Sequence, residues 1–165
     1  MKTIKVGING FGRIGRAFLK VAWDRPEIEI VAVNDLGSVE NMAYLLKYDT
    51  VYRKWNHEIK VKGQEINIDG KAVKVLAEKD PSKLPWGDLG VDVVVESTGL
   101  FTSYEKAKVH IDAGAKKVVI SAPAKDSDGS VPGETILLGV NEEKFGTCDV
   151  TSNASCTTNA ASPLI

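Results

Sequence analysis

The sequence predicts an α/β fold built on a doubly wound, mainly parallel sheet. Short runs of β-branched and aliphatic residues alternate along the chain with segments whose apolar residues recur at helical spacing. One stretch in the first half changes to a period of two, which is typical of antiparallel strands. Strands that alternate with helices favour a parallel sheet, so this stretch is expected to form a short antiparallel meander within or beside it.

The first 34 residues have the pattern of a strand–helix–strand unit. Residues 4–9 are rich in apolar residues and end at Gly10, and a helical spacing of apolar residues then continues to Pro26. Residues 27–34 carry four aliphatic residues and predict the second strand. Such a unit is right-handed and its two strands are parallel.

The rest of the chain continues the alternation. The period of two covers residues 57–76, with turns expected at Gly63 and at Asp69-Gly70. The other predicted elements are a helix at about 39–48, a strand at 91–96, a helix that ends at Gly114, strands at 117–121 and 135–140, and a helix that begins near residue 156.

Composition narrows the class of protein. The 165 residues carry 21 Lys and Arg against 22 Asp and Glu, a net charge of −1. Near neutrality argues against a nucleic-acid partner, because attraction to phosphates needs a basic surface. There is no run of 18 apolar residues, and the N-terminus enters a strand pattern without a signal-peptide core. With only two cysteines, these features predict a cytoplasmic protein with no membrane partner.

The strongest motif is the glycine pattern at residues 10–15 (GFGRIG). It follows a strand, opens a helix, and is followed 20 residues after Gly15 by Asp35. Gly10 permits a tight turn, Gly12 lets a pyrophosphate approach the backbone, and Gly15 lets the helix pack against the strand. Asp35 would accept the ribose hydroxyls and repel a 2′-phosphate. A ligand-free turn explains this context poorly, so we predict a Rossmann-type site for NAD in preference to NADP.

Polar groups follow several predicted strands. In a doubly wound sheet, ligands bind beyond the carboxyl ends of the strands. For the Ser97 turn alone, ordinary turn chemistry is the simpler explanation, but the coincidence of five groups predicts a ligand crevice. The groups are residues 10–15, Asn34-Asp35, Ser97-Thr98-Gly99, Ser121-Ala122-Pro123 and Ser155-Cys156-Thr157.

The two cysteines have different surroundings. Cys156 follows small polar residues and begins a helical pattern, so its thiol is expected at a helix N-terminus, where the dipole favours a thiolate. A small buried cysteine is generally the commoner case, and Cys148, within a strand-like run, fits it. We predict that Cys156 is a reactive nucleophile.

Taken together, the motifs resemble those of phosphorylating glyceraldehyde-3-phosphate dehydrogenase. They follow the family's order along the whole chain, and SCTTN is highly specific. The matching segments are residues 5–16 (KVGINGFGRIGR), 33–35 (VND), 47–51 (KYDTV), 96–101 (ESTGLF), 121–126 (SAPAKD) and 155–159 (SCTTN).

The resemblance implies an NAD-dependent phosphorylating aldehyde dehydrogenase of glycolysis that works as a homotetramer on glyceraldehyde 3-phosphate and inorganic phosphate. Cys156 would attack the aldehyde, NAD would take the hydride, and phosphate would open the resulting thioester to an acyl phosphate. The implied residue roles are Gly10, Arg13 and Ile14 on the pyrophosphate, Asn34 and Asp35 on the adenosine side, Thr98 and Gly99 beside the adenosine, Ser121 towards the nicotinamide, and Ser155 and Thr157 on substrate or phosphate. No metal site is expected.

The family also has features that this sequence does not match. Its general base is a histidine about one helix after the cysteine, whereas the chain has only His57 and His110, which we interpret as a surface residue and a helix residue without catalytic roles. The resemblance therefore divides the chain into an NAD-binding domain at 1–150 and the start of a catalytic domain at 151–165, and the chain alone is expected to be inactive. The alternatives are the corresponding half of an erythrose-4-phosphate dehydrogenase, or a stand-alone NAD-binding module in which Cys156 senses redox state.

Overall fold

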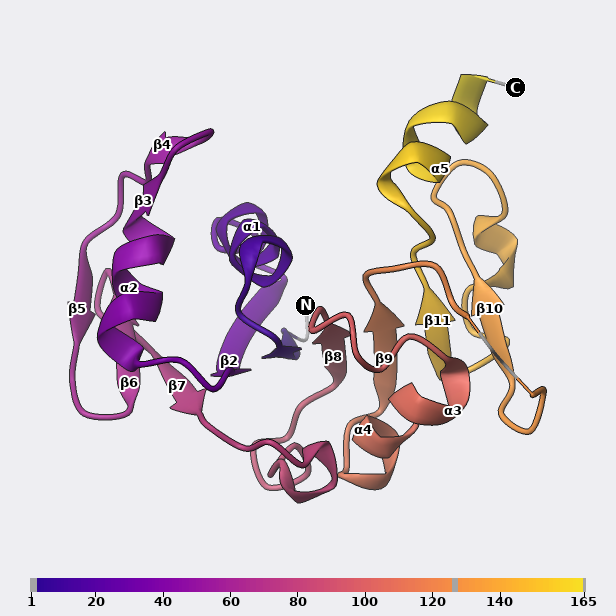
Figure 1. The fold of residues 1–165 in the computed structure, drawn as a ribbon, viewed down its shortest axis with the longest axis horizontal. Coiled ribbons are helices and arrows are strands. Elements are labelled where there is room, and N and C mark those ends of the chain that lie inside the picture. Colours follow the sequence, from indigo (N-terminus) through magenta and orange to yellow (C-terminus); the bar gives the residue numbers. More distant parts are fainter. Residues whose placement is uncertain (1–2, 126–127, 165) are drawn as a thin grey trace.

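The predicted doubly wound sheet is confirmed in a computed structural model that describes residues 3–125 and 128–164 (Figure 1). In the described part of the chain, nine strands form one sheet in the order β10-β11-β9-β8-β1-β2-β7-β6-β5, and neighbours from β10 to β7 are parallel. The parallel strands are β1 (Ile4–Asn9), β2 (Ile28–Asn34), β7 (Lys71–Leu76), β8 (Val93–Glu96), β9 (Lys117–Ile120), β10 (Gly133–Thr135) and β11 (Val150–Ser152).

The antiparallel meander is also confirmed. It consists of β5 (Ile59–Val61), β6 (Glu65–Ile68) and β7, and the middle strand β6 pairs antiparallel with both β5 and β7. Strand β7 is shared, because its other edge pairs parallel to β2. Ile66, Ile68 and Val73 are buried, as the period of two requires of a strand with one face on the core. The meander therefore extends one edge of the parallel sheet.

Helices cover both faces of the sheet. Helix α1 (Arg13–Ala22) and helix α2 (Val39–Lys47) pack Leu19 and Leu46 against one face. The other face is covered by α3 (Tyr104–Ala107), α4 (Val109–Asp112) and the buried Trp86, which follows the 3-10 turn η1 (Pro81–Lys83). Successive residues of the central strands contribute to opposite cores. In Figure 1 the central strand β8 lies between α1 and the α3–α4 pair.

Two predicted elements were wrong in detail. The helix expected up to Gly114 is divided at Lys108 into α3 and α4. His110 turns inward there, and its bonds to Trp86 and Glu96 fix the direction of α4. This constraint cannot be read from helical spacing.

The strand expected at 135–140 is the other error. Strand β10 ends at Thr135, and the following residues form a turn. The Asn141 side chain causes this change, because its oxygen accepts from Leu137 N at 2.8 Å and its amide donates to the Thr135 carbonyl at 2.9 Å. Leu138 is left 77% exposed. An asparagine that bonds the nearby backbone competes with strand pairing.

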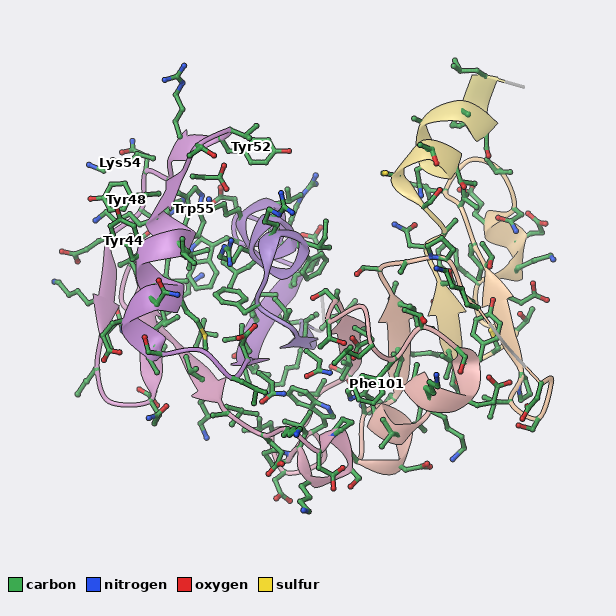
Figure 2. The ribbon with its side chains drawn as sticks, viewed as in Figure 1. Tyr44, Tyr48, Tyr52, Lys54, Trp55 and Phe101 are labelled. Carbon is green, nitrogen blue, oxygen red and sulfur yellow. The ribbon has the colours of Figure 1, made fainter. Side chains whose placement is uncertain are left out.

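The remaining short elements lie outside the main sheet. They are the hairpin of β3 (Tyr48–Asp49) and β4 (Arg53–Lys54), the 3-10 turns η2 (Glu142–Lys144) and η3 (Ser162–Leu164), and helix α5 (Cys156–Ala161). The β3–β4 hairpin presents exposed aromatic rings with α2, and the Tyr44 and Tyr48 ring centroids are 5.0 Å apart (Figure 2). No helix within residues 3–125 or 128–164 is long and apolar enough to cross a membrane.

Candidate functional site

A cavity of about 350 Å³ opens where β1, β2 and β8 end. We call it the crevice. It lies at the carboxyl edge of the parallel strands, beside β1, where the chain continues to β2 on one side and to β8 on the other. Ligands usually bind at such a switch point in the strand order of a doubly wound sheet. Among the residues that line it are Gly10, Gly12, Asn34, Asp35, Thr98 and Phe101. The structure therefore brings together three of the five polar groups singled out in the sequence.

The three glycines of the loop have three distinct environments. Gly10 has φ +90°, and a Cβ there would lie 2.7 Å from Thr98 N. A Cβ on Gly15 would lie 2.1 Å from the Gly10 carbonyl oxygen, so the contact between helix and strand requires glycine. A Cβ on Gly12 would meet nothing within 4 Å. The open space at Gly12 is where a ligand could approach the backbone.

The N-terminus of α1 supplies unpaired amide donors beside this space. Its first intrahelical bond runs from Arg16 N to the Gly12 carbonyl at 3.1 Å, so the amides of residues 12–15 precede the helical ladder. Gly12 is the N-cap and makes no side-chain cap, and the first turn holds no acidic residue. The guanidinium of Arg16 bonds the Phe11 carbonyl at 2.8 Å and holds the loop. This arrangement fits an anionic group such as a pyrophosphate.

Asp35 is joined directly to the glycine loop. Its Oδ2 accepts from Phe11 N at 2.8 Å, and its Oδ1 accepts from Gly37 N at 3.0 Å. A carboxylate has about four acceptor positions, so two such bonds leave capacity for ligand hydroxyls. The position of the carboxylate is therefore fixed relative to the helix amides.

Asn34 lines the crevice, but its amide is already bonded within the protein. Its Nδ2 donates to Asn9 Oδ1 at 2.8 Å and to the Glu78 carbonyl at 2.9 Å. Its Oδ1 accepts from Glu78 N at 2.9 Å. The side chain thus fastens the segment after β7 to the tips of β1 and β2.

The turn after β8 forms the other wall. Ser97 Oγ donates to the Gly10 carbonyl at 2.6 Å, which ties this turn to the glycine loop. Thr98 donates from both its backbone amide and its hydroxyl to the carboxylate of Glu96. Gly99 has φ +76° and open space around its Cα. Thr98 lines the crevice, whereas Gly99 does not.

Ser121 and Cys156 lie apart from the crevice lining. Ser121 follows β9, and both its amide and its hydroxyl donate to the Glu96 carbonyl, at 2.9 and 3.0 Å. Cys156 is exposed at the first position of α5, as predicted. Figure 1 shows α5 past the end of β11, whereas α1 lies beside β2. All five groups follow parallel strands and share one edge, but they do not share one cavity.

The turn that presents Cys156 is held by short-range bonds. Ser155 caps α5 by accepting from Thr158 N at 3.0 Å and bonds the Thr157 hydroxyl at 2.8 Å. Asn159 Nδ2 donates to the Asn153 and Ser155 carbonyls. Ala154 has φ +56°, an uncommon conformation for a residue other than glycine, and strain of this kind is concentrated at functional sites.

The other cysteine and the two histidines are placed as follows. Cys148 is buried, with its thiol 3.3 Å from the Val150 carbonyl, as predicted. His57, predicted at the surface, is half-buried there: its side chain is 19% exposed, because it stacks on Trp55 and lies 2.5 Å from Asp69 Oδ2. The hydrogen bonds from His57 and from the Glu58 amide hold the pKa of Asp69 below its usual value. His110 is fully buried.

Sequence reasoning missed the buried carboxylate of Glu96. It is 2% exposed and bonds Asn9, Thr98 and His110 beneath the crevice. One signal was present, since Glu96 is the only charged residue in β8, whose other members are all valine. No group of three or more His, Cys, Asp or Glu that could hold a metal ion occurs in the described ranges, and Asp126 of the SAPAKD segment lies outside them.

Comparisons with known proteins agree with this geometry. Residues 4–104 match the family described as glyceraldehyde 3-phosphate dehydrogenase, NAD binding domain. Glyceraldehyde-3-phosphate dehydrogenase 1 of Bacillus subtilis is 52% identical over 164 residues, covering 98% of this chain and 48% of the relative. The Streptomyces coelicolor protein is 52% identical over 165 residues, and that of Thermotoga maritima 49% over 164, each covering 98% of this chain and 48% of the relative.

The chain thus spans about half the length of the curated relatives it matches. The match begins at β1 and includes the glycine loop, Asp35 and the Thr98 turn, which are the parts that form the crevice. On the combined evidence of sequence, fold and crevice, the chain belongs to the glyceraldehyde-3-phosphate dehydrogenase family and contains its NAD-binding domain.

Proposed function

We propose that NAD binds in the crevice with its pyrophosphate on the amides at the start of α1 and its adenosine ribose on Asp35. The observation that carries this proposal is the 2.8 Å bond between Asp35 Oδ2 and Phe11 N. This bond holds the ribose acceptor beside the pyrophosphate donors before the ligand binds, which lowers the cost of ordering the site. The negative charge of Asp35 would disfavour the 2′-phosphate of NADP.

The other cofactor contacts are proposed from the family resemblance. Gly10, Arg13 and Ile14 would lie along the pyrophosphate, and Asn34 beside the adenosine. Thr98 and Gly99 would flank the adenosine, and Ser121 would face the nicotinamide. Support comes from the crevice lining for Gly10, Asn34 and Thr98, and from the exposed position of Ile14, which is 56% exposed beside the loop.

We propose Cys156 as the nucleophile of the family reaction. Its thiolate would attack the carbonyl carbon of glyceraldehyde 3-phosphate and form a thiohemiacetal. NAD, when bound, accepts the hydride. The thioester left on Cys156 would then be opened by inorganic phosphate, which gives an acyl phosphate and restores the thiolate. The exposed position of Cys156 at the start of α5 supports this role, and Ser155 and Thr157 would contact substrate or phosphate.

The reaction also needs a proton acceptor for the hydroxyl of the thiohemiacetal. His110 is enclosed by Glu96, Asn9 and Trp86, and His57 pairs with Asp69, so neither is engaged with Cys156. A missing general base costs about 10²–10⁴-fold in rate. We therefore propose that the 165 residues alone bind NAD without steady turnover.

We propose that the NAD-binding domain covers residues 1–150 and that the catalytic domain begins at residue 151. This boundary falls at the start of β11, which runs from Val150 to Ser152.

Assembly is proposed from the same resemblance. The family forms homotetramers, and the aromatic surface over α2 and the β3–β4 hairpin supports self-association of this chain. Val51 is 75% exposed, Tyr52 73% and Tyr44 61%. Exposed apolar surface of this kind is typical of a face that contacts another protein.

Titration calorimetry tests the cofactor assignment. NAD and ADP-ribose should bind, and NADP should bind at least about tenfold more weakly, because burying a second charge against Asp35 is unfavourable. Correctly folded protein that binds neither NAD nor ADP-ribose would contradict the proposal. In a coupled assay with phosphate, the 165 residues should turn over neither glyceraldehyde 3-phosphate nor erythrose 4-phosphate, because no general base serves Cys156. Steady turnover of either aldehyde would contradict the proposed inactivity and would identify the substrate.

A further inference from the structure

A fully buried carboxylate lies beneath the crevice. Glu96 ends β8 and is 2% exposed. Its Oε1 accepts from Thr98 N at 2.8 Å and from the Thr98 hydroxyl. Its Oε2 accepts from Asn9 Nδ2 at 2.6 Å and is 2.9 Å from His110 Nε2. Four donors therefore surround one carboxylate, the number that its lone pairs can accept.

The neighbouring tryptophan fixes the protonation of His110. Trp86 Nε1 lies 3.1 Å from His110 Nδ1, and both side chains are completely buried. The indole N–H can only donate, so Nδ1 must be an acceptor without a proton. The single ring proton is then on Nε2 and points at Glu96. His110 is consequently uncharged, and the contact with Glu96 is a hydrogen bond to a carboxylate without an opposing cation among these four partners.

The hydrogen bonds that reach Glu96 through Asn34 and Asn9 also have a fixed direction. The Glu78 peptide donates to Asn34 Oδ1 and accepts from Asn34 Nδ2, which fixes the orientation of that amide. Asn34 Nδ2 then donates to Asn9 Oδ1, so Asn9 must direct its Nδ2 towards Glu96. Donors therefore converge on Glu96 from both ends, and no member can reverse without opposing its neighbour.

The geometry points to Glu96 as a positioning residue for the nucleotide, with His110 locked as its neutral partner. This inference rests on the proposed binding of NAD in the crevice. Glu96 fixes two residues that line the crevice, Asn9 and Thr98, and the Thr98 hydroxyl accepts from Leu100 N at 3.1 Å, which shapes the wall beside the ligand. Phe101, labelled in Figure 2, also lines the crevice. Its ring packs edge-on against that of His110, with the ring centroids 6.1 Å apart.

The substitution Glu96→Gln tests the positioning role. It keeps the shape but opposes an amide N–H₂ to a fixed donor in either orientation, to Asn9 and His110 on one side or to the Thr98 backbone amide on the other. The Kd for ADP-ribose, measured by calorimetry, should rise about tenfold or more. The matched control is Glu143→Gln, an exposed residue of η2, which should change the Kd by less than about twofold. Near-ultraviolet circular dichroism establishes that each variant is folded.

A second substitution separates orientation from simple loss of packing. Trp86→Phe removes the indole donor, so His110 can carry its proton on Nδ1 and accept at Nε2 from the amide introduced by Glu96→Gln. The double variant should therefore bind ADP-ribose with a Kd about threefold lower than that of Glu96→Gln alone, although Trp86→Phe by itself lowers the stability of the fold. A purely structural role for Glu96 predicts instead that the two losses add.

Nitrogen-15 NMR of the imidazole rings tests the proton position without any variant at Glu96. The signals of His110, distinguished from those of His57 with a His57→Gln variant, should show one protonated nitrogen, Nε2. A proton on Nδ1, or on both nitrogens, would overturn the inference. So would a folded Glu96→Gln variant that binds ADP-ribose as tightly as the unsubstituted protein. If the unsubstituted protein binds no ADP-ribose, the proposed function fails, and the NMR result still decides the state of His110.

Discussion

At the tip of β2, the carboxylate of Asp35 accepts from the backbone of the glycine loop and from Gly37. The substitution Asp35→Asn keeps the size of the side chain but turns one acceptor into a donor that faces an amide. We expect the Kd for NAD to rise about tenfold, because a partly buried hydrogen bond is lost and the new donor faces another donor. We also expect weaker discrimination against NADP, since the negative charge is removed.

Calorimetry with both dinucleotides measures the two effects. Asp88→Asn, at an exposed position remote from the crevice, is the control and should leave both values unchanged. An Asp35→Asn variant that binds NAD with the original affinity would show that the ribose lies elsewhere.

The two thiols provide a second prediction for single residues. Cys156 is exposed at the start of α5, whereas Cys148 is buried and bonded to the Val150 carbonyl. Iodoacetamide near neutral pH should therefore modify Cys156 at least about tenfold faster than Cys148. Peptide mapping by mass spectrometry measures both rates in one sample. In Cys156→Ser only the slow reaction should remain, and faster modification of Cys148 would contradict the assignment.

At the scale of one element, the contact between α1 and β1 depends on Gly15. A methyl group there would lie 2.1 Å from the Gly10 carbonyl, so Gly15→Ala must shift the helix or the loop. We expect a loss of about 3 kcal/mol in the free energy of unfolding, measured by urea denaturation, because the overlap is with backbone atoms.

Gly12→Ala is the matched variant for that experiment. The added methyl meets no protein atom within 4 Å, so the free energy of unfolding should change by less than about 1 kcal/mol. The affinity for NAD should nevertheless fall, because the methyl occupies the space next to the helix amides. Equal destabilisation by the two substitutions would show that the loop is packed differently.

The elements also show how far local sequence patterns can be trusted. The β1–α1–β2 unit and the meander were predicted correctly, because their periodicity, their glycines and their turn residues lie close together in the chain. The break at Lys108 and the turn after Thr135 could not be predicted. They depend on the inward hydrogen bonds of His110 and on the side-chain hydrogen bonds of Asn141. The spacing of apolar residues along the chain carries no information about such bonds.

For the whole molecule, the turn aspartates predict how stability depends on pH. Hydrogen-bond donors hold the pKa values of several aspartate carboxyls below their usual value. At Asp49 the donors are the backbone amides of Tyr52 and Val51. At Asp69 they are the ring of His57 and the backbone amide of Glu58. At Asp80 and Asp128, the hydroxyl and the amide of the serine two residues later have the same effect.

A lowered pKa in the folded state adds stability above the unfolded pKa and removes it as the pH falls through the folded value. The free energy of unfolding should therefore be steady between about pH 5 and 7 with respect to these groups and decrease below about pH 4. Urea denaturation at several pH values measures this. Below pH 4 the free energy of unfolding should fall less steeply with pH in Asp69→Asn. A free energy of unfolding that increases on acidification would contradict the prediction.

What the sequence alone determined is local: the strand–helix–strand unit, the glycine loop, the acid at residue 35 and a cysteine at the start of a helix. Each follows from residues that are neighbours in the chain or are spaced by a regular period. Only the tertiary structure decided that Asn34 uses its amide within the protein, that Cys156 lies outside the crevice, and that Glu96 is held by Asn9 and His110. The physical reason is separation, since Asn9 and Glu96 are 87 positions apart and hydrogen bond only because β1 and β8 are adjacent in the sheet.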